Sequence, residues 1–249
     1  MAYTVVEIGC MDFRLNGAYA NGNDVVHLRN AGGSVGGFAE ELKALIASNP
    51  SIKDIVIIDH RDCGGLKVAQ TMLHTPQGKN ELGITDESHF AFEKTLASHF
   101  RARGLENAPM GALEMENPSI QVAVAKRILQ ELGREGIRVS AKLLDVPSGL
   151  HADAVTVAIG VSGRGYRELA EIAGVTPSGS YFIQATNPDD IKKDLEVAVT
   201  VMGKKDVRFL ALDRDTQQRA ESFVRSLKAE RYMVDIEPRM FSAYKERVK

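Results

Sequence analysis

Two short segments of the sequence hold residue types that can bind a metal ion together. Residues 10–14 read CMDFR and residues 60–65 read HRDCGG. In an extended chain alternate side chains share a face, so we expect Cys10, Asp12 and Arg14 to point into one pocket. The two-residue spacer between His60 and Cys63 lets both side chains converge on one ion as the chain turns. Together the segments offer two thiols, an imidazole, an acid and a base.

The candidate ligands are Cys10, His60 and Cys63, a set typical of catalytic zinc. Two cysteines and one histidine make a three-ligand site, which leaves the fourth position of a tetrahedral Zn²⁺ ion for water. The chain of 249 residues contains only these two cysteines. Two cysteines in a chain of this length do not make a disulfide framework, and they fit a reducing compartment. We therefore expect Zn²⁺ as the cofactor.

Short apolar runs rich in β-formers alternate with stretches of helical spacing along the chain. These patterns predict strands at 3–8, 24–28, 54–58, 137–146, 154–159, 181–185, 207–212 and 233–236. They predict helices at 38–47, at both ends of 64–104 with a loop near 75–78, and at 119–132, 188–202 and 215–229. Such alternation is typical of an α/β fold with a mostly parallel central sheet flanked by helices.

Both candidate segments directly follow predicted strands. Open α/β sheets build their sites at the carboxyl ends of their parallel strands, so this placement favours a functional site. The glycines at 64 and 65 are expected to open a helix, and its positive end would favour a thiolate at Cys63.

A glycine-rich segment, GGSVGG at residues 32–37, precedes the helix expected to begin near Phe38. Glycine lets the backbone approach a small ligand closely, and the first turn of a helix has free N–H groups. We therefore assign the backbone of Ala31, Gly32 and Gly33 to the substrate pocket.

With these motifs in place, the first part of the chain resembles the β-class carbonic anhydrases. The resemblance is carried by Cys-x-Asp-x-Arg at 10–14, Arg-Asn-Ala-Gly-Gly at 29–33 and His-x-x-Cys-Gly-Gly at 60–65, in matching order and spacing. The strand ending in LDVPSG at 144–149 is similar to the final core strand of that family. The resemblance predicts a β-carbonic anhydrase-like catalytic core at 1–150, and leaves 151–249 as a C-terminal α/β extension of unknown role.

The resemblance implies reversible hydration of carbon dioxide to bicarbonate. It implies that the three candidate ligands bind zinc and that Asp12 and Arg14 form a dyad. In the family, the matching Asp either accepts a hydrogen bond from zinc-bound water or ligates the metal in an inactive form, and the Arg holds it away. Family sites lie near a dimer interface, which implies a homodimer or a higher homo-oligomer.

Charge and geometry support the same roles. Two thiolates cancel the charge of Zn²⁺, so this centre should acidify its water less than an all-histidine site, where that pKa is about 7. We therefore expect turnover to rise as the pH climbs above neutral. Arg14 can fix the Asp12 carboxylate through a two-pronged pair that Lys cannot reproduce. Asp12 would then orient the zinc-bound hydroxide for attack.

Other functions stay open on the sequence alone. The same zinc hydroxide could attack carbonyl sulfide or carbon disulfide, which are also small linear molecules. A second alternative is a non-catalytic zinc-containing protein that acts through its C-terminal half, and a third is a thiol redox protein using Cys10 and Cys63. One position departs from the family pattern, because Phe13 stands where a small residue is usual. Strand alternation predicts that Phe13 points away from the dyad.

The composition bounds the partners of the chain. Its 31 basic and 33 acidic residues give a net charge of −2, and the basic residues are spread out, so we expect no nucleic-acid partner. The apolar runs fall short of the roughly 18 residues that cross a membrane, so we expect no membrane association. We read no signal peptide at the N-terminus and expect a cytoplasmic protein with a small-molecule substrate.

A faint internal similarity links two of the predicted strands. Residues 53–58 read KDIVII and residues 205–210 read KDVRFL. A decayed internal duplication is one interpretation, and chance similarity between two short strand–helix units is the other.

Overall fold

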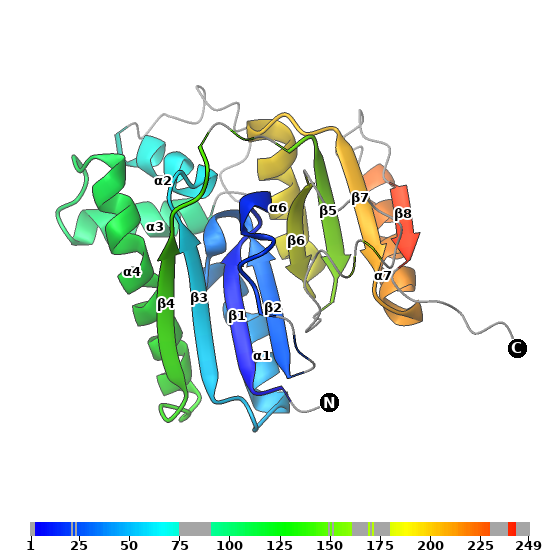
Figure 1. The fold of residues 1–249 in the computed structure, drawn as a ribbon, viewed down its shortest axis with the longest axis horizontal. Helices are drawn as coiled ribbons and strands as arrows, with labels where there is room; N and C mark the ends of the chain where they lie inside the picture. The colour runs from blue at the N-terminus through cyan, green and yellow to red at the C-terminus, as the bar shows by residue number, and fades with distance from the viewer. Residues whose placement is uncertain are drawn as a thin grey trace, which may run out of the picture.

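A computed structural model describes residues 3–20, 22, 24–74, 91–148, 150, 152–160, 169, 171, 180–229 and 239–242. Its strands form one eight-stranded sheet in the order β4-β3-β1-β2-β6-β5-β7-β8 (Figure 1). The strands are β1 (Val5–Cys10), β2 (Val25–Asn30), β3 (Asp54–His60), β4 (Arg138–Leu144), β5 (Ala154–Ile159), β6 (Ser180–Ala185), β7 (Asp206–Ala211) and β8 (Arg239–Ser242).

Neighbouring strands run parallel except at the centre of the sheet. There β2 and β6 are antiparallel and pair through Arg29 and Gln184. All residues of β2, β5 and β6 are buried, as expected of strands inside a covered sheet. The predicted fold class, a mostly parallel sheet flanked by helices, is confirmed.

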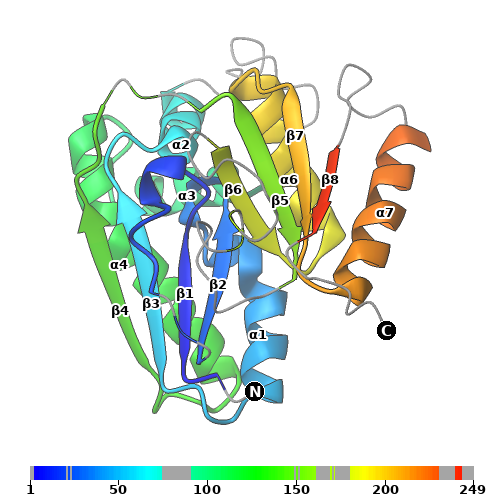
Figure 2. The ribbon, with the colours of Figure 1, turned by 45° about the vertical axis from the view of Figure 1, so that its right-hand side comes forward.

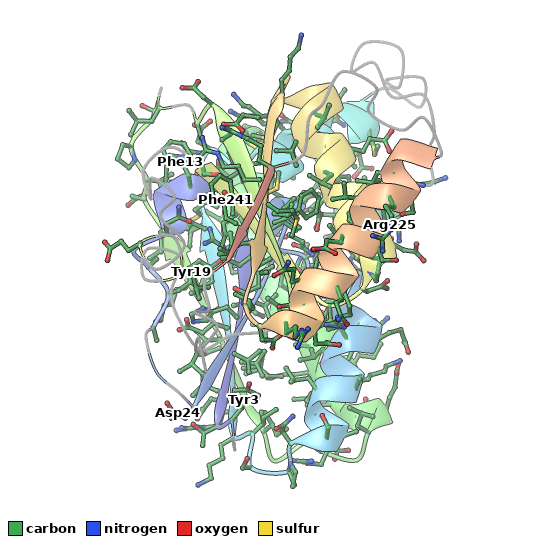
Figure 3. The ribbon with its side chains drawn as sticks, turned by 90° about the vertical axis from the view of Figure 1, so that its right-hand side faces the viewer. Tyr3, Phe13, Tyr19, Asp24, Arg225 and Phe241 are labelled. Atoms are coloured by element: carbon green, nitrogen blue, oxygen red, sulfur yellow. The ribbon has the colours of Figure 1, made fainter. Side chains whose placement is uncertain are left out.

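The helices are α1 (Ala39–Ser48), α2 (Gly64–His74), α3 (Ala91–Ala102), α4 (Met110–Glu131), α6 (Pro188–Glu196) and α7 (Arg214–Ala229). Three of them, α1, α6 and α7, lie on the same face of the sheet (Figures 2 and 3). Phe13 and Tyr19 lie on the opposite face (Figure 3). Within the described part of the chain, no helix is both long and apolar enough to cross a membrane.

Helix α4 begins at Met110, well before the start predicted at residue 119, and carries Pro118 inside it. A proline inside a helix removes one backbone hydrogen bond, which is why the sequence suggested a boundary there. Tertiary contacts hold the first turns in place. Asn117 donates to Asp59 Oδ2 at 2.6 Å, and Glu114 Oε1 accepts the backbone N–H of Asp62 at 2.6 Å.

The C-terminal predictions are met in part. The helix predicted at 188–202 is α6 followed by a π-helical turn at Val197–Val201. The strand predicted at 233–236 and the loop predicted near 75–78 lie outside the described residues. Strand β8 at Arg239–Ser242 was not predicted.

Candidate metal centre

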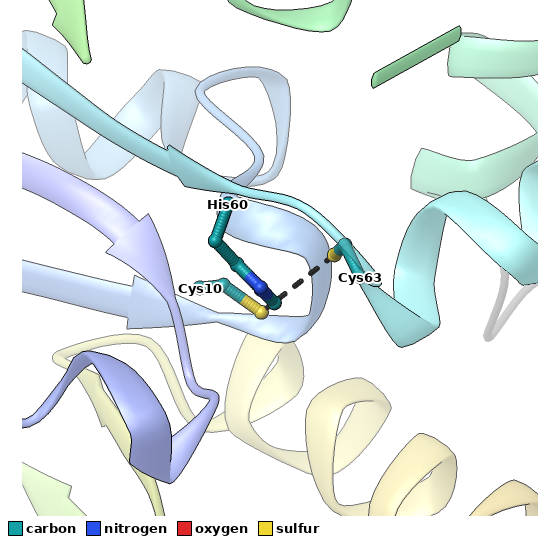
Figure 4. Close-up of side chains that lie close together, drawn as sticks. All are labelled: Cys10, His60 and Cys63. Carbon is teal, nitrogen blue, oxygen red and sulfur yellow. Dashed lines mark hydrogen bonds between the residues drawn. The ribbon is translucent and has the colours of Figure 1, made fainter. Parts of the chain in front are cut away.

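The three candidate ligands meet at the carboxyl edge of the N-terminal strands. Cys10 ends β1, His60 ends β3, and Cys63 directly precedes α2. Their side chains are buried, at 5%, 0% and 0% exposure. One ligand atom from each lies within 4.8 Å of the others, and the two sulfur atoms are 3.9 Å apart (Figure 4).

These atoms fit a tetrahedral metal ion. Zn–S bonds of about 2.3 Å at a tetrahedral angle place two sulfurs about 3.8 Å apart. His60 Nδ1 lies 2.8 Å from the Arg61 carbonyl, which is the partner that holds a ligating histidine with its other nitrogen free. His60 Nε2 is buried and has no hydrogen-bond partner among the described residues. A cation at this point would give that orphaned nitrogen its partner.

The pKa values of the three clustered side chains are shifted in different directions. The hydrogen bond from the Cys63 thiol, with His60 nearby, lowers the pKa of Cys10 well below its usual value. The same hydrogen bond and burial raise the pKa of Cys63. The helix does begin at Gly64, but its positive end does not outweigh these two effects on Cys63. Although burial opposes it, the negative charge on Cys10 raises the pKa of His60 to about 9.

Asp12 and Arg14 form a two-pronged ion pair beside the cluster. Arg14 Nε donates to Asp12 Oδ1 at 2.9 Å and Arg14 Nη2 donates to Asp12 Oδ2 at 2.7 Å. Burial alone would raise the pKa of Asp12, but the hydrogen bonds from Arg14 hold it below its usual value. Asp12 Oδ2 is also 4.0 Å from His60 Nε2, so the carboxylate borders the metal position.

The route by which Arg14 reaches Asp12 differs from the prediction of an extended chain. Strand β1 ends at Cys10, and Phe13–Leu15 form a short 3₁₀-helix. Asp12 caps this turn, because its Oδ1 accepts the Arg14 backbone N–H at 2.9 Å. The turn, rather than strand alternation, brings the two side chains together. The Phe13 ring packs edge-on against the ring of Tyr181, with 5.6 Å between the ring centroids. That Phe13 points away from the dyad stays a prediction.

Two further residues in this region were missed from the sequence. Asp62 Oδ2 accepts from Arg14 Nη1 at 3.0 Å, and the Asp62 carbonyl accepts from Nη2 at 3.1 Å. The Pro147 carbonyl accepts from Nη1 at 3.0 Å. With the two bonds to Asp12, all five guanidinium N–H groups of Arg14 have acceptors. The HRDCGG motif contains Asp62, but nothing in the sequence indicates that it faces Arg14.

The glycine-rich segment packs against the metal cluster. Gly32 and Gly33 have positive φ angles of 79° and 68°, which glycine adopts without strain. A Cβ on Gly33 would lie 3.0 Å from the Cys10 nitrogen, and one on Gly65 would lie 2.7 Å from the Gly32 Cα. The Ala31 N–H is not free for a substrate, because Asp194 Oδ1 accepts it at 2.9 Å.

A small cavity of about 40 Å³ opens beside the cluster. Its N-terminal wall comes from the segments already described, including Ala31 and Gly32 but not Gly33. Its other wall comes from the C-terminal half of the chain and consists of Tyr181, Val197 and Met202. No motif in the sequence links these three residues, because they come together only in the folded chain.

Comparisons with known proteins add a similarity of fold. No protein-family model and no curated protein matches the chain. Solved structures do match, and those compared here are β-carbonic anhydrases, the family that the motifs resemble. An enzyme of Sordaria macrospora, described as tetrameric, is 20% identical with a TM-score of 0.41, over 58% of this chain and 77% of that one.

Two other matches are of the same kind. The carbonic anhydrase of Glaciozyma antarctica is 27% identical with a TM-score of 0.36, over 58% of this chain and 78% of that one. The carbonic anhydrase of Streptococcus mutans is 24% identical with a TM-score of 0.37, over 59% of this chain and 78% of that one.

Proposed function

We propose that the chain is a zinc-dependent carbonic anhydrase that interconverts carbon dioxide and bicarbonate. The observation that carries this proposal is the convergence of Cys10, His60 and Cys63 beside an Asp12 carboxylate that Arg14 clamps. Zinc held by these three ligands supplies a Lewis acid that acidifies water at its open position.

The residues around the metal position divide the remaining work. Asp12 accepts the hydrogen bond of the attacking water and so sets the direction of its lone pair. Arg14 keeps Asp12 in that orientation, because its own five donors are all engaged. The small cavity is lined mostly by apolar atoms and has room for a molecule of the size of carbon dioxide.

The proposal includes the finer points that the sequence suggested. Because two thiolates offset the charge of the metal, we expect turnover to rise as the pH increases above neutral. We also propose a cytoplasmic homo-oligomer with a small-molecule substrate. The catalytic core at 1–150 with an extension at 151–249 remains our proposed division of the chain.

Metal analysis coupled to stopped-flow carbon dioxide hydration tests this function. We expect about one zinc per chain in the wild type. Asp12→Asn should keep its zinc and lose about 100-fold in kcat, because the orienting carboxylate is gone. Cys63→Ser should lose zinc and activity together. Zinc-loaded wild type that hydrates no carbon dioxide at any pH would contradict the proposal. If such protein turns over carbonyl sulfide alone, carbonyl sulfide is the substrate instead of carbon dioxide.

A further inference from the structure

The order of the strands is symmetric about the centre of the sheet. In the N-terminal half the first strand, β1, lies between the second and third strands, and the fourth is outermost. In the C-terminal half β5 lies between β6 and β7, and β8 is outermost. The two halves therefore share one topology, and they meet through their second strands.

The strand register defines equivalent positions in the two halves. Val5 pairs with Val25 and Asp54 at the start of its half. Ala154 pairs with Ser180 and Asp206 in the same way. Counting along the second strands, Arg29 is four residues past Val25, and Gln184 is four residues past Ser180.

Arg29 and Gln184 are therefore equivalent, and they are also the pair that joins the two halves. Two equivalent residues pair with each other only on a two-fold axis. This axis passes through the sheet between β2 and β6, which are antiparallel there. The strands of the two halves therefore point in opposite directions, and their carboxyl ends lie at opposite ends of the sheet (Figure 1).

Two hydrogen bonds between the halves obey the same symmetry. Ala31 and Thr186 are the first residues after β2 and β6. The Ala31 N–H donates to Asp194 on α6 at 2.9 Å, and the Thr186 N–H donates to Glu41 on α1 at 2.7 Å. In each carboxyl group the second oxygen is buried without a hydrogen-bond partner among the described residues. This reciprocal exchange is the pattern of an isologous interface, here within one chain.

An ion pair repeats at the two outer edges. Asp54, the first residue of β3, pairs with Arg138, the first residue of β4, at 2.7 Å. Asp206, the first residue of β7, pairs with Arg239, the first residue of β8. Such exposed ion pairs add little to stability, so stability alone does not explain why the same pair stands at both places.

The metal ligands are not repeated. In the equivalent register Cys10 corresponds to Ile159, and His60 and Cys63 correspond to Leu212 and Asp215. Ile159 is buried in the core at 1% exposure. Among the residues that the structure describes, the cluster at Cys10 is the one group able to hold a metal.

We propose that residues 154–242 are a second copy of the unit at 5–144 that has lost its metal ligands and acts as a built-in partner subunit. It provides the wall of the metal cavity formed by Tyr181, Val197 and Met202, and its Asp194 is the positioning residue that fixes Ala31 and the glycine turn beside Cys10. This reading of the cavity as a substrate pocket rests on the proposed function. The duplication itself rests on topology, register and hydrogen bonds.

The two-fold symmetry supplies a matched control for a test on the full chain. Asp194→Leu removes the acceptor beside the metal cavity, whereas Glu41→Leu removes its equivalent at the opposite edge. Asp194→Asn keeps an acceptor oxygen. Each variant is loaded with Co²⁺, which reports ligand geometry in its visible spectrum, and is titrated with azide as a small linear anion.

We expect Asp194→Leu to weaken azide binding by about tenfold and to shift the cobalt spectrum, and Asp194→Asn to stay within about twofold of wild type. Both leucine variants should lower the Tm by about 2–6 °C. Glu41→Leu should leave azide binding within about twofold of wild type. Equal effects of the two leucine variants on azide binding, or no effect of Asp194→Leu, would overturn the positioning role.

A wall variant covers the case in which Asp194→Leu does not fold. Met202→Ala should widen the cavity and change the ratio of thiocyanate to azide affinity by about threefold or more. An unchanged ratio would show that the C-terminal half does not form the wall. Failure of wild-type protein to bind cobalt would instead count against the proposed zinc function.

Discussion

In the proposed mechanism Arg14 is the residue that orients the Asp12 carboxylate. It is 6% exposed in its side chain and binds two carboxylates and two carbonyls at once. Replacing one partner of a buried, fully hydrogen-bonded ion pair strongly destabilises the folded protein. We propose that the same arrangement keeps Asp12 from turning toward the metal position, which it borders with its Oδ2 4.0 Å from His60 Nε2.

Replacing Arg14 by lysine tests this role. Lysine carries three donors on a flexible stem and cannot bond both oxygens of Asp12 while holding Asp62. We expect Arg14→Lys to lower kcat by about tenfold or more, because Asp12 loses its orientation. Arg103→Lys, which alters exposed contacts with Glu116 and Ser119, is the control and should keep wild-type turnover. Equal turnover in Arg14→Lys and wild type would remove Arg14 from the mechanism.

The protonation of the cluster predicts how zinc binding depends on pH. Below its raised pKa of about 9, His60 is protonated in the metal-free protein, and Cys63 also carries a proton. Zinc must displace these protons, so its apparent affinity rises with pH until they are gone. Competition with a chelator between about pH 6.5 and 8.5 should show a gain of about tenfold or more per pH unit. An affinity that is flat across this range would contradict the assigned protonation states.

At the scale of elements, the start of α2 and the turn at 31–33 are pressed together. Gly65 lies against Gly32 with no room for a methyl group, whereas Gly64 has nothing within 4 Å of its would-be Cβ. Both glycines sit in the first turn of the same helix. Close packing of two backbones, rather than an unusual φ angle, therefore makes glycine necessary at position 65.

The pair Gly65→Ala and Gly64→Ala separates packing from helix propensity. Gly65→Ala should push the turn away from α2 and lower the free energy of unfolding by about 1–3 kcal/mol. It should also weaken zinc binding, because Cys10 and Cys63 flank the turn. Gly64→Ala should be neutral or stabilise by up to about 1 kcal/mol. Urea unfolding of both variants measures the difference, and equal values would refute the close approach.

Helix α3 places Glu93 in a cavity of about 310 Å³ that it shares with Asp194. Burial raises the pKa of Glu93 to about 8. Between about pH 4.5 and 8 the unfolded carboxyl group is ionised while the folded one keeps its proton, so the folded state binds more protons. This group therefore makes stability fall as the pH rises through that window, and its effect is constant above it.

Glu93→Gln should remove this part of the pH dependence. We expect the variant to gain on the order of 2 kcal/mol relative to wild type at pH 9 and much less at pH 4.5. Urea unfolding at both pH values measures the gain, and Glu116→Gln on the exposed face of α4 is the control. A gain of the same size at both pH values would show that Glu93 is not protonated in the fold.

In the whole molecule the two halves of the chain form one sheet, and among the residues that the structure describes one cluster is able to hold a metal ion. Strand β2 lies inside this sheet, between β1 and β6, with all six of its residues buried. The backbone of the site is tied to the other half as well, because the Met11 carbonyl accepts the Phe182 N–H at 2.8 Å. Residues 1–150 thus carry the candidate metal ligands, and the C-terminal half supplies the other wall of the cavity beside them.

Removing the C-terminal half should expose this dependence. In a chain of residues 1–150 the edge of β2 that faces β6 has no partner strand, although all six β2 residues are buried in the full chain, and such edges pair with other chains. We expect it to associate or precipitate, and sedimentation velocity measures this against the full chain. A stable single chain of 1–150 that binds azide as tightly as the full protein would contradict a built-in partner.

The sequence predicted the ligands because they stand in short motifs next to strand ends, where spacing decides geometry. It also predicted the mostly parallel sheet, since strand and helix patterns alternate. It could not place Asp194, Tyr181 or Met202, because they reach the site through contacts between distant segments. Asp194 and Ala31, for example, are more than 160 residues apart in the chain. The start of α4 was missed for the same reason, as tertiary contacts there override the signal of Pro118.

The proposed function requires one zinc ion held by Cys10, His60 and Cys63 with a fourth position open to water. X-ray absorption at the zinc edge of the purified protein measures these ligands. We expect two sulfur ligands at about 2.3 Å and two nitrogen or oxygen ligands at about 2.0–2.1 Å. A zinc ion without sulfur ligands, or with one sulfur only, would contradict it.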